Sequence, residues 1–175
     1  EQHIRRDKAT SNICTAQVLL AVMAGMYAVY HGPQGLKEIA NRVHTFARRA
    51  SASLTAMQYS QQNNAYFDTL NIVTSELTEK IYQSALDAKL NIRIMDKDHI
   101  AVSFDETTTE KDLEKLIGIF AKAKSSTDLH LNQTTLAEVI QGKNKRATAF
   151  LEHPVFNTHH SETEMLRYIS SLEKK

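Results

Sequence analysis

The sequence predicts an α+β fold: a long helical hairpin followed by a small, mainly antiparallel sheet with helices on one face. Three observations lead to this prediction. A Gly-Pro pair separates an apolar run from a second stretch with a clean helical period. The pattern then changes to alternating apolar and polar residues around a short turn. Helical patterns that open on capping residues flank these alternating segments.

The first predicted helix is apolar on every side over residues 18–30. No Asp, Glu, Lys or Arg occurs between Ala9 and Leu36. At about 1.5 Å per residue this helix reaches only about 20 Å, short of the roughly 30 Å of a bilayer core. We therefore expect a helix buried all round, either in a core or beneath another domain.

A second helix follows the break at His31–Pro33, because Gly suits the end of one helix and Pro the first turn of the next. Its polar face carries Arg42, Arg48 and Arg49, which we expect to face solvent or the acidic surface of a partner. The apolar stripe has i, i+3, i+4, i+7 spacing and consists of Leu36, Ile39, Ala40, Val43, Phe46, Ala47, Ala50, Leu54 and Met57.

The period changes after the polar residues 61–64. Residues 66–73 are typical of a strand, and Thr74 or Ser75 is expected to cap a helix. Residues 92–104 alternate around an Asp-Lys-Asp turn, which predicts a β-hairpin. The helix before this hairpin is expected to bury Leu77, Ile81 and Ala85.

The next helix is predicted to begin at Thr107 or Thr109, since Glu110 and Asp112 follow three residues later. Its apolar face consists of Leu113, Leu116, Ile117 and Phe120. Residues 122–128 are expected to form a loop, and residues 134–140 and 148–151 short helical turns. The motif at residues 161–164 is a capping box for a last helix with Met165, Leu166, Ile169 and Leu172 inward.

Composition narrows the function classes. The 175-residue chain has a formal net charge of +1, which gives no electrostatic reason to expect nucleic acid or an anionic membrane. Its single cysteine, Cys14, cannot form an internal disulfide, which favours a reducing compartment. The chain begins without Met and ends directly after a helical pattern, so both ends are expected to be cuts in a longer chain.

No motif of a self-contained active site is present: no Gly-rich phosphate loop, no Gly-x-Ser-x-Gly turn, no His-Glu-x-x-His and no cysteine pair. The densest reactive group is His153, His159 and His160. Adjacent histidines normally point apart, and zinc needs further donors, so we expect no metal site. The main interpretation is a polar loop before a capped helix. The alternative is a loop that lines a site completed by another segment.

Two features near the N-terminus have open interpretations. Arg5 and Arg6, beside Lys8, form either a solvated arm or a segment that binds an anion or docks a domain. Cys14 lies at the start of the apolar helix, where an inert packing role is favoured. A helix N-terminus also activates thiols, so a reactive role stays open.

Strings near both ends resemble the glycine-cleavage P-protein family. Residues 1–17 (EQHIRRDKATSNICTAQ) and 26–36 (MYAVYHGPQGL) match almost letter for letter. Residues 153–168 (HPVFNTHHSETEMLRY) form a second anchor. Residues 48–150 match in pattern more than in letters, so the resemblance spans the chain with specific motifs at its ends.

The resemblance implies an enzyme of two fold-type-I aminotransferase-like halves, each with a large cofactor domain and a smaller C-terminal domain. Only the second half holds the Schiff-base lysine for pyridoxal 5'-phosphate. This chain is similar to the end of the first half, so it is expected to hold no catalytic residue and to bind no cofactor. Residues 1–62 would link the large and small domains, and residues 63–175 would form the small domain. Lys8 and Lys37 lack the context of the Schiff-base lysine.

The implied reaction is the decarboxylation of glycine, with pyridoxal phosphate as electron sink, followed by transfer of the aminomethyl group to the lipoyl group of H-protein. The resemblance implies two sets of candidate site residues. The active-site-lining set is His159, His160, Ser161, Glu162 and Thr163. The anion-binding or domain-docking set is Arg5, Arg6 and Thr10.

The expected partners are the remainder of the P-protein, the lipoylated H-protein and a second copy of the full enzyme in a homodimer, with no nucleic acid and no membrane. The expected compartment is a bacterial cytoplasm, or the mitochondrial matrix in a eukaryote. Two alternatives stay open: the small domain of another fold-type-I pyridoxal enzyme, and an autonomous helical interaction module. The surface of residues 18–30 separates them, since it should be bare in an enzyme piece and covered in a module.

Overall fold

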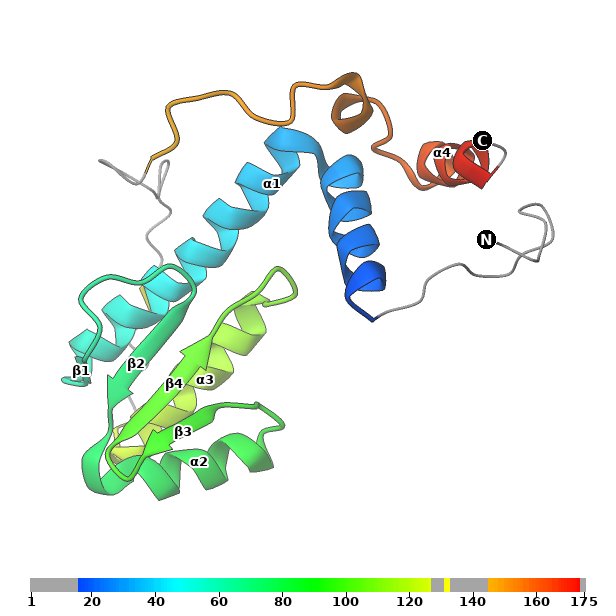
Figure 1. Cartoon of the computed structure of the whole chain (residues 1–175). Coiled ribbons are helices and arrows are strands. Elements are labelled where there is room, and N and C mark those ends of the chain that lie inside the picture. Colours follow the sequence, from blue (N-terminus) through cyan, green and yellow to red (C-terminus); the bar gives the residue numbers. More distant parts are fainter. Residues whose placement is uncertain (1–15, 127–130, 133–144, 174–175) are drawn as a thin grey trace. The chain divides into compact units, whose positions relative to one another are not determined.

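The computed structural model describes residues 16–126, 131–132 and 145–173, whose helices and strands appear in Figure 1. The chain divides into two compact units. We call Glu1–Glu38 with Lys145–Lys175 the terminal unit, and Ile39–Asn144 the sheet unit. The predicted domain boundary after residue 62 concerns a complete enzyme and stays a prediction. Outside the described residues lie Arg5, Arg6, Lys8, Thr10, Cys14 and the helical turn predicted at residues 134–140.

The longest helix, α1 (Ala16–Ala56), is broken at Gly32 into two helical segments. Gly32 has φ 63° and ψ −178°, a left-handed φ that favours glycine. Pro33 opens the second segment, where its missing N–H costs least. The interruption predicted at residues 31–33 is therefore confirmed.

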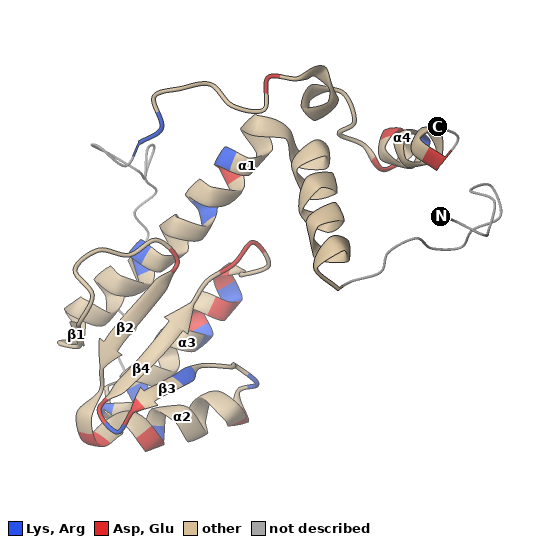
Figure 2. Ribbon diagram, in the orientation of Figure 1, with Lys and Arg blue, Asp and Glu red and all other residues tan. Residues whose placement is uncertain are grey.

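The first segment of α1 is mostly exposed. The side chains of Val18, Leu20 and Met23 are 44%, 65% and 59% exposed. Figure 2 shows neither acidic nor basic residues on this segment. The prediction that it is buried in a core of this chain is wrong, because the described residues supply too little apolar surface to cover it. Burial beneath another domain stays a prediction.

The second segment of α1 supplies one wall of the sheet unit's core. The predicted stripe is confirmed in its C-terminal part, since Phe46, Ala47, Ala50 and Leu54 are each at most 4% exposed. Their 3.6-residue spacing places them on one helix face, which packs with the buried strand residues in a single hydrophobic cluster.

The sheet has four antiparallel strands in the order β1-β2-β4-β3. They are β1 (Ser60–Gln61), β2 (Thr69–Val73), β3 (Arg93–Asp96) and β4 (His99–Ser103). In the centre Leu70 pairs with Val102 and Ile72 with Ile100, so that four buried side chains share one face. The predicted β-hairpin is confirmed, and the strand predicted at residues 66–73 begins three residues later.

Helices α2 (Thr78–Asp87) and α3 (Glu110–Ala123) cover this apolar face together with α1. Ile81 and Ala85 of α2 are fully buried, as are Ile117 and Phe120 of α3. Figure 1 shows these elements grouped around the sheet. The prediction of helices on one face of a small antiparallel sheet is therefore confirmed.

Of the helix N-caps predicted in the sheet unit, one is observed and the others are not. Thr109 and Asp112 form the predicted capping box of α3, whereas Thr107 bonds to Asp105 instead. Neither Thr74 nor Ser75 caps α2, which follows the short 3-10 helix η2 (Ser75–Leu77). The Thr74 hydroxyl is drawn into the interior, 2.7 Å from the hydroxyl of Thr78.

The C-terminal part of the terminal unit contains the 3-10 helix η4 (Pro154–Asn157) and helix α4 (Glu162–Glu173). The helical turn predicted at residues 148–151 is wrong: those residues form no helix, and Leu151 has a positive φ of 53°. The inward orientation predicted for α4 is also wrong for Leu166 and Ile169, which are 67% and 39% exposed. Among the described residues of this unit, their face of α4 has no covering layer.

Candidate functional site

The segment that precedes α4 is folded by its own polar side chains. The Nδ1 atom of His153 accepts a hydrogen bond from the backbone N–H of Val155 at 3.2 Å and thereby caps η4. The Asn157 amide donates to the carbonyls of Leu151 (3.0 Å) and His153 (3.2 Å), and the Thr158 hydroxyl donates to Pro154 O at 2.7 Å. These short-range bonds fix a stiff loop, here called the histidine loop (residues 151–161), without any apolar core.

Ser161 and Glu164 then start α4. The Glu164 carboxylate accepts from the backbone N–H and the hydroxyl of Ser161 at 3.2 and 3.0 Å, and the Ser161 hydroxyl accepts from Glu164 N at 3.3 Å. This confirms the predicted capping box. The hydroxyl of Ser161, with backbone N–H groups, lowers the pKa of Glu164. Ser161 therefore stabilises the N-terminus of α4.

His160 ties the histidine loop to the break in α1. Its Nδ1 lies 2.7 Å from the carbonyl oxygen of Tyr30, across 130 positions of sequence. Gly32 lies directly beneath: a Cβ atom added there would be 2.7 Å from Phe156 O and 2.8 Å from Cε1 of His160. The loop backbone and the imidazole therefore occupy the space that a side chain at residue 32 would need.

His159 points elsewhere. Its ring stacks on Tyr168 of α4, with the ring centroids 4.4 Å apart and the ring planes inclined by 14°. Within the described part of the chain it makes no hydrogen bond. Glu162 and Thr163, in the first turn of α4, are exposed. Of the five predicted lining residues, His160 and Ser161 thus hold the loop together, His159 is half-buried against Tyr168, and Glu162 and Thr163 are exposed.

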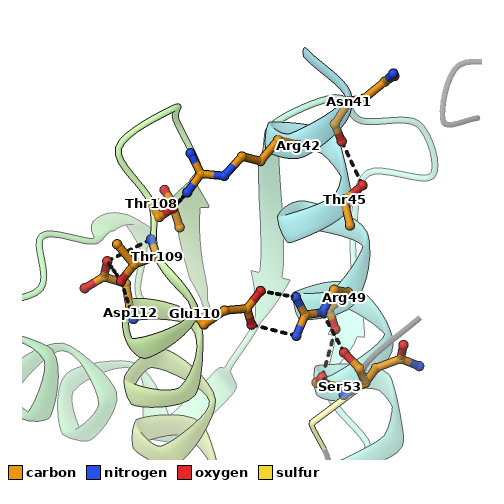
Figure 3. A network of polar contacts seen from close by, with 10 residues as sticks. Asn41, Arg42, Thr45, Arg49, Ser53, Thr108, Thr109, Glu110 and Asp112 are labelled. Carbon is orange, nitrogen blue, oxygen red and sulfur yellow. Dashed lines mark hydrogen bonds and ion pairs between the residues drawn. The ribbon is translucent and has the colours of Figure 1, made fainter. Parts of the chain in front are cut away.

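A second polar network, in the sheet unit, was not predicted (Figure 3). Arg49 forms a two-pronged ion pair with Glu110, at 2.6 and 2.8 Å, and its Nε donates to Asn132 O at 2.8 Å. Arg42 donates to the carbonyls of Glu106 and Thr108, each at 2.7 Å. The hydrogen bonds from Arg49 lower the pKa of Glu110.

This network corrects the expectation that Arg49 faces solvent or a partner, whereas Arg42 and Arg48 are exposed as expected. The Arg49 side chain is only 13% exposed. Its partners lie more than 60 residues away in sequence, so no local pattern could have indicated them. Arg42 and Arg49 tie α1 to the start of α3, which is a structural role.

The sheet unit contains a pocket of about 280 Å³, whose fit to pyridoxal phosphate depends on the residues that line it. That cofactor needs a lysine for its aldehyde and donors or cations for its phosphate. The pocket instead contains two carboxylates, Asp105 and Asp112, beside Asn91 and Thr108, and no lysine or arginine lines it. Its donor set does not fit the cofactor, and no step of the reaction is assigned to it.

No group of three or more His, Cys, Asp or Glu in the described part of the chain could hold a metal ion. None of the helices described has the length and apolar character needed to cross a bilayer.

The comparisons with known proteins agree with the strings at the chain ends. The family model described as glycine cleavage system P-protein matches residues 1–120. The chain is 49% identical over its whole length to glycine dehydrogenase (decarboxylating) of Cupriavidus metallidurans and 50% identical to that of Aliivibrio salmonicida. It covers 18% of the length of each relative. The chain therefore belongs to the glycine cleavage system P-protein family.

Proposed function

We propose that this chain is the part of a glycine decarboxylase that closes its first, lysine-lacking half. The activity of the whole enzyme would be the decarboxylation of glycine and the transfer of the aminomethyl group to the lipoyl group of H-protein. Pyridoxal phosphate would supply the electron sink, held by the other half. The chain's own contribution would be to support the site from outside, through the histidine loop.

The bare first segment of α1 is the observation that supports this proposal. Its exposed side chains, among them Val18, Leu19, Leu20, Val22 and Met23, lie on several sides of the helix. A self-sufficient interaction module would not leave such a surface uncovered. The relatives are more than five times longer than this chain, so they contain the additional chain needed to cover the segment. The remainder of the P-protein is therefore the partner that fits this surface.

Cysteine accessibility in the complete enzyme tests this burial. On a Cys14→Ser background, Leu20→Cys should react with a maleimide about a hundredfold more slowly in the complete enzyme than in the 175-residue chain, since a fully covered thiol reacts only after opening. The matched control is Lys97→Cys in the β3–β4 turn, where the native side chain is 90% exposed. Equal labelling of Leu20→Cys in both proteins would contradict the docking of this segment.

A cofactor titration tests the functional assignment. Added pyridoxal phosphate should give no stoichiometric lysine adduct with this chain, whereas the complete enzyme should show one. Glycine-dependent exchange of labelled bicarbonate should require both halves. A stoichiometric adduct on a lysine of this chain would refute the assignment and favour another fold-type-I pyridoxal enzyme.

The remaining expectations belong to the complete enzyme. We propose that it is a homodimer that also binds the lipoylated H-protein, with neither nucleic acid nor membrane as partner. Its compartment, bacterial cytoplasm or mitochondrial matrix, stays a prediction.

A further inference from the structure

We propose that the two adjacent histidines have separate tasks, an inference that rests on the function proposed above. His160 is a positioning residue that fastens the histidine loop to the α1 break. His159 is the imidazole that this arrangement presents to the substrate region of the complete enzyme. The His-His motif thus contains one residue that acts through the loop and one whose ring is held against Tyr168 for contact with a ligand.

The acceptor that His160 meets is produced by the helix break. The last carbonyl groups of any helix lack an N–H partner from the following turn. Tyr30 lies two residues before Gly32, where the first segment of α1 ends. Its carbonyl oxygen therefore needs a donor from elsewhere, and the His160 ring supplies one at 2.7 Å.

This contact also determines the state of the His160 ring. A carbonyl oxygen only accepts hydrogen bonds, so Nδ1 of His160 must carry the proton. In the neutral ring, Nε2 is then the nitrogen with a free lone pair. Asparagine places an amide N–H close to the Nδ1 position, whereas glutamine places one close to Nε2. Substitution of His160 by asparagine or by glutamine therefore distinguishes whether Nδ1 or Nε2 makes the functional contact.

A second contact makes the attachment stiff. Because Gly32 has no side chain, the carbonyl of Phe156 and the Cε1 atom of His160 approach its backbone closely. The histidine loop thus touches the break through both its backbone and an imidazole. Loss of the His160 bond alone would leave the loop near its place but free to shift, which is how a positioning residue acts on catalysis.

His159, the preceding residue, is fixed in a different way. The His159 ring is fixed by stacking on Tyr168 rather than by a hydrogen bond. Within the described part of the chain neither ring nitrogen makes a hydrogen bond, although the ring lies near enough to Glu164 to help lower the pKa of that carboxylate. Both nitrogens are therefore able to bond to a ligand. An imidazole with a fixed plane and free nitrogens suits hydrogen bonding to a small polar substrate such as an amino acid.

Kinetics of four variants in the complete enzyme, with H-protein present, test this division. His160→Asn, which keeps a donor near Nδ1, should retain at least about half of the wild-type kcat. His160→Gln should lower kcat about tenfold, as expected when a supporting contact is lost. His159→Asn and His159→Gln should both lower kcat/KM at least about tenfold while the melting temperature stays unchanged.

His99→Asn serves as the matched control, because that ring lies in the sheet unit, outside the histidine loop, and bonds to the nearby side chain of Asp96. Its kinetics should equal those of the wild type. The inference is overturned if His160→Asn is as damaging as His160→Gln, or if both His159 variants keep wild-type kcat/KM. An inactive wild-type enzyme in the same assay would instead refute the proposed function itself.

Discussion

The sheet unit and the terminal unit are stabilised in opposite ways. In the sheet unit, three helices and the two central strands, β2 and β4, share one hydrophobic cluster, with Leu70, Ile81 and Phe120 fully buried. In the described part of the terminal unit, Val29 is the single buried apolar side chain, and α4 has none. That unit is held by hydrogen bonds such as His160 to Tyr30 O. The sheet unit therefore has a core of its own, whereas the described part of the terminal unit depends mainly on hydrogen bonds.

The largest expected effect comes from the core of the sheet unit. Phe120→Ala should lower the free energy of unfolding by about 3–5 kcal/mol, because the ring is fully buried and meets Tyr59 edge-on at 5.1 Å. Denaturant unfolding of the chain measures this value. Leu166→Ala in α4, at a 67% exposed side chain, should change it by less than about 0.5 kcal/mol. Equal losses would contradict the difference between the units.

Gly32→Ala addresses the terminal unit. The substitution forces a left-handed φ on alanine and puts Cβ 2.7 Å from Phe156 O, so it should cost about 1–3 kcal/mol locally. Hydrogen exchange of the α4 and η4 amides should accelerate, while β2 and β4 stay protected. Gly25→Ala is the control: nothing lies within 4 Å of its added Cβ, and it should stabilise the helix by up to about 1 kcal/mol.

Thr109→Ala removes the capping box of α3. The lost bonds to Asp112 should lower the free energy of unfolding by about 1 kcal/mol, as measured by thermal or denaturant unfolding. Thr109→Ser keeps the oxygen and should remain within a few tenths of a kcal/mol of the wild type. If serine were as damaging as alanine, the methyl contacts of Thr109 and not its cap would matter.

The smallest expected effect is the pH dependence of the Arg49–Glu110 pair. Arg49 lowers the pKa of Glu110 in the folded state, so the pair stabilises the fold at pH values above the ordinary glutamate pKa. That contribution is lost as the pH falls through the lowered folded pKa. Because the Glu110 side chain is 59% exposed, the loss should stay below about 1 kcal/mol. Unfolding curves of Glu110→Gln at pH 7 and pH 3 should differ less than those of the wild type.

The features that were predicted correctly are those determined by interactions between residues close in sequence. The capping boxes at Thr109 and Ser161, the helix break at Gly32 and the hairpin around residues 96–98 each depend on neighbours within four residues. The stripe of α1 was also predictable, since a 3.6-residue period alone defines its face.

Long-range contacts were not predictable. The partners of Arg49 and His160 are 61 and 130 residues away, and nothing in the local sequence distinguishes these side chains from solvent-facing ones. The two-residue strand β1 is too short to show alternation. For the candidate site, the sequence indicated the correct loop but not which histidine holds it, because that depends on a carbonyl exposed by a distant break.

The close approach at Gly32 has an evolutionary consequence. The missing side chain of residue 32 and the ring of residue 160 share one space, so mutations at these positions should be epistatic. A larger residue 32 would require both a smaller residue 160 and a shift of the Phe156 carbonyl, and loss of the imidazole would leave the Tyr30 carbonyl without its donor. Across the family, the two positions should therefore drift together or stay invariant together.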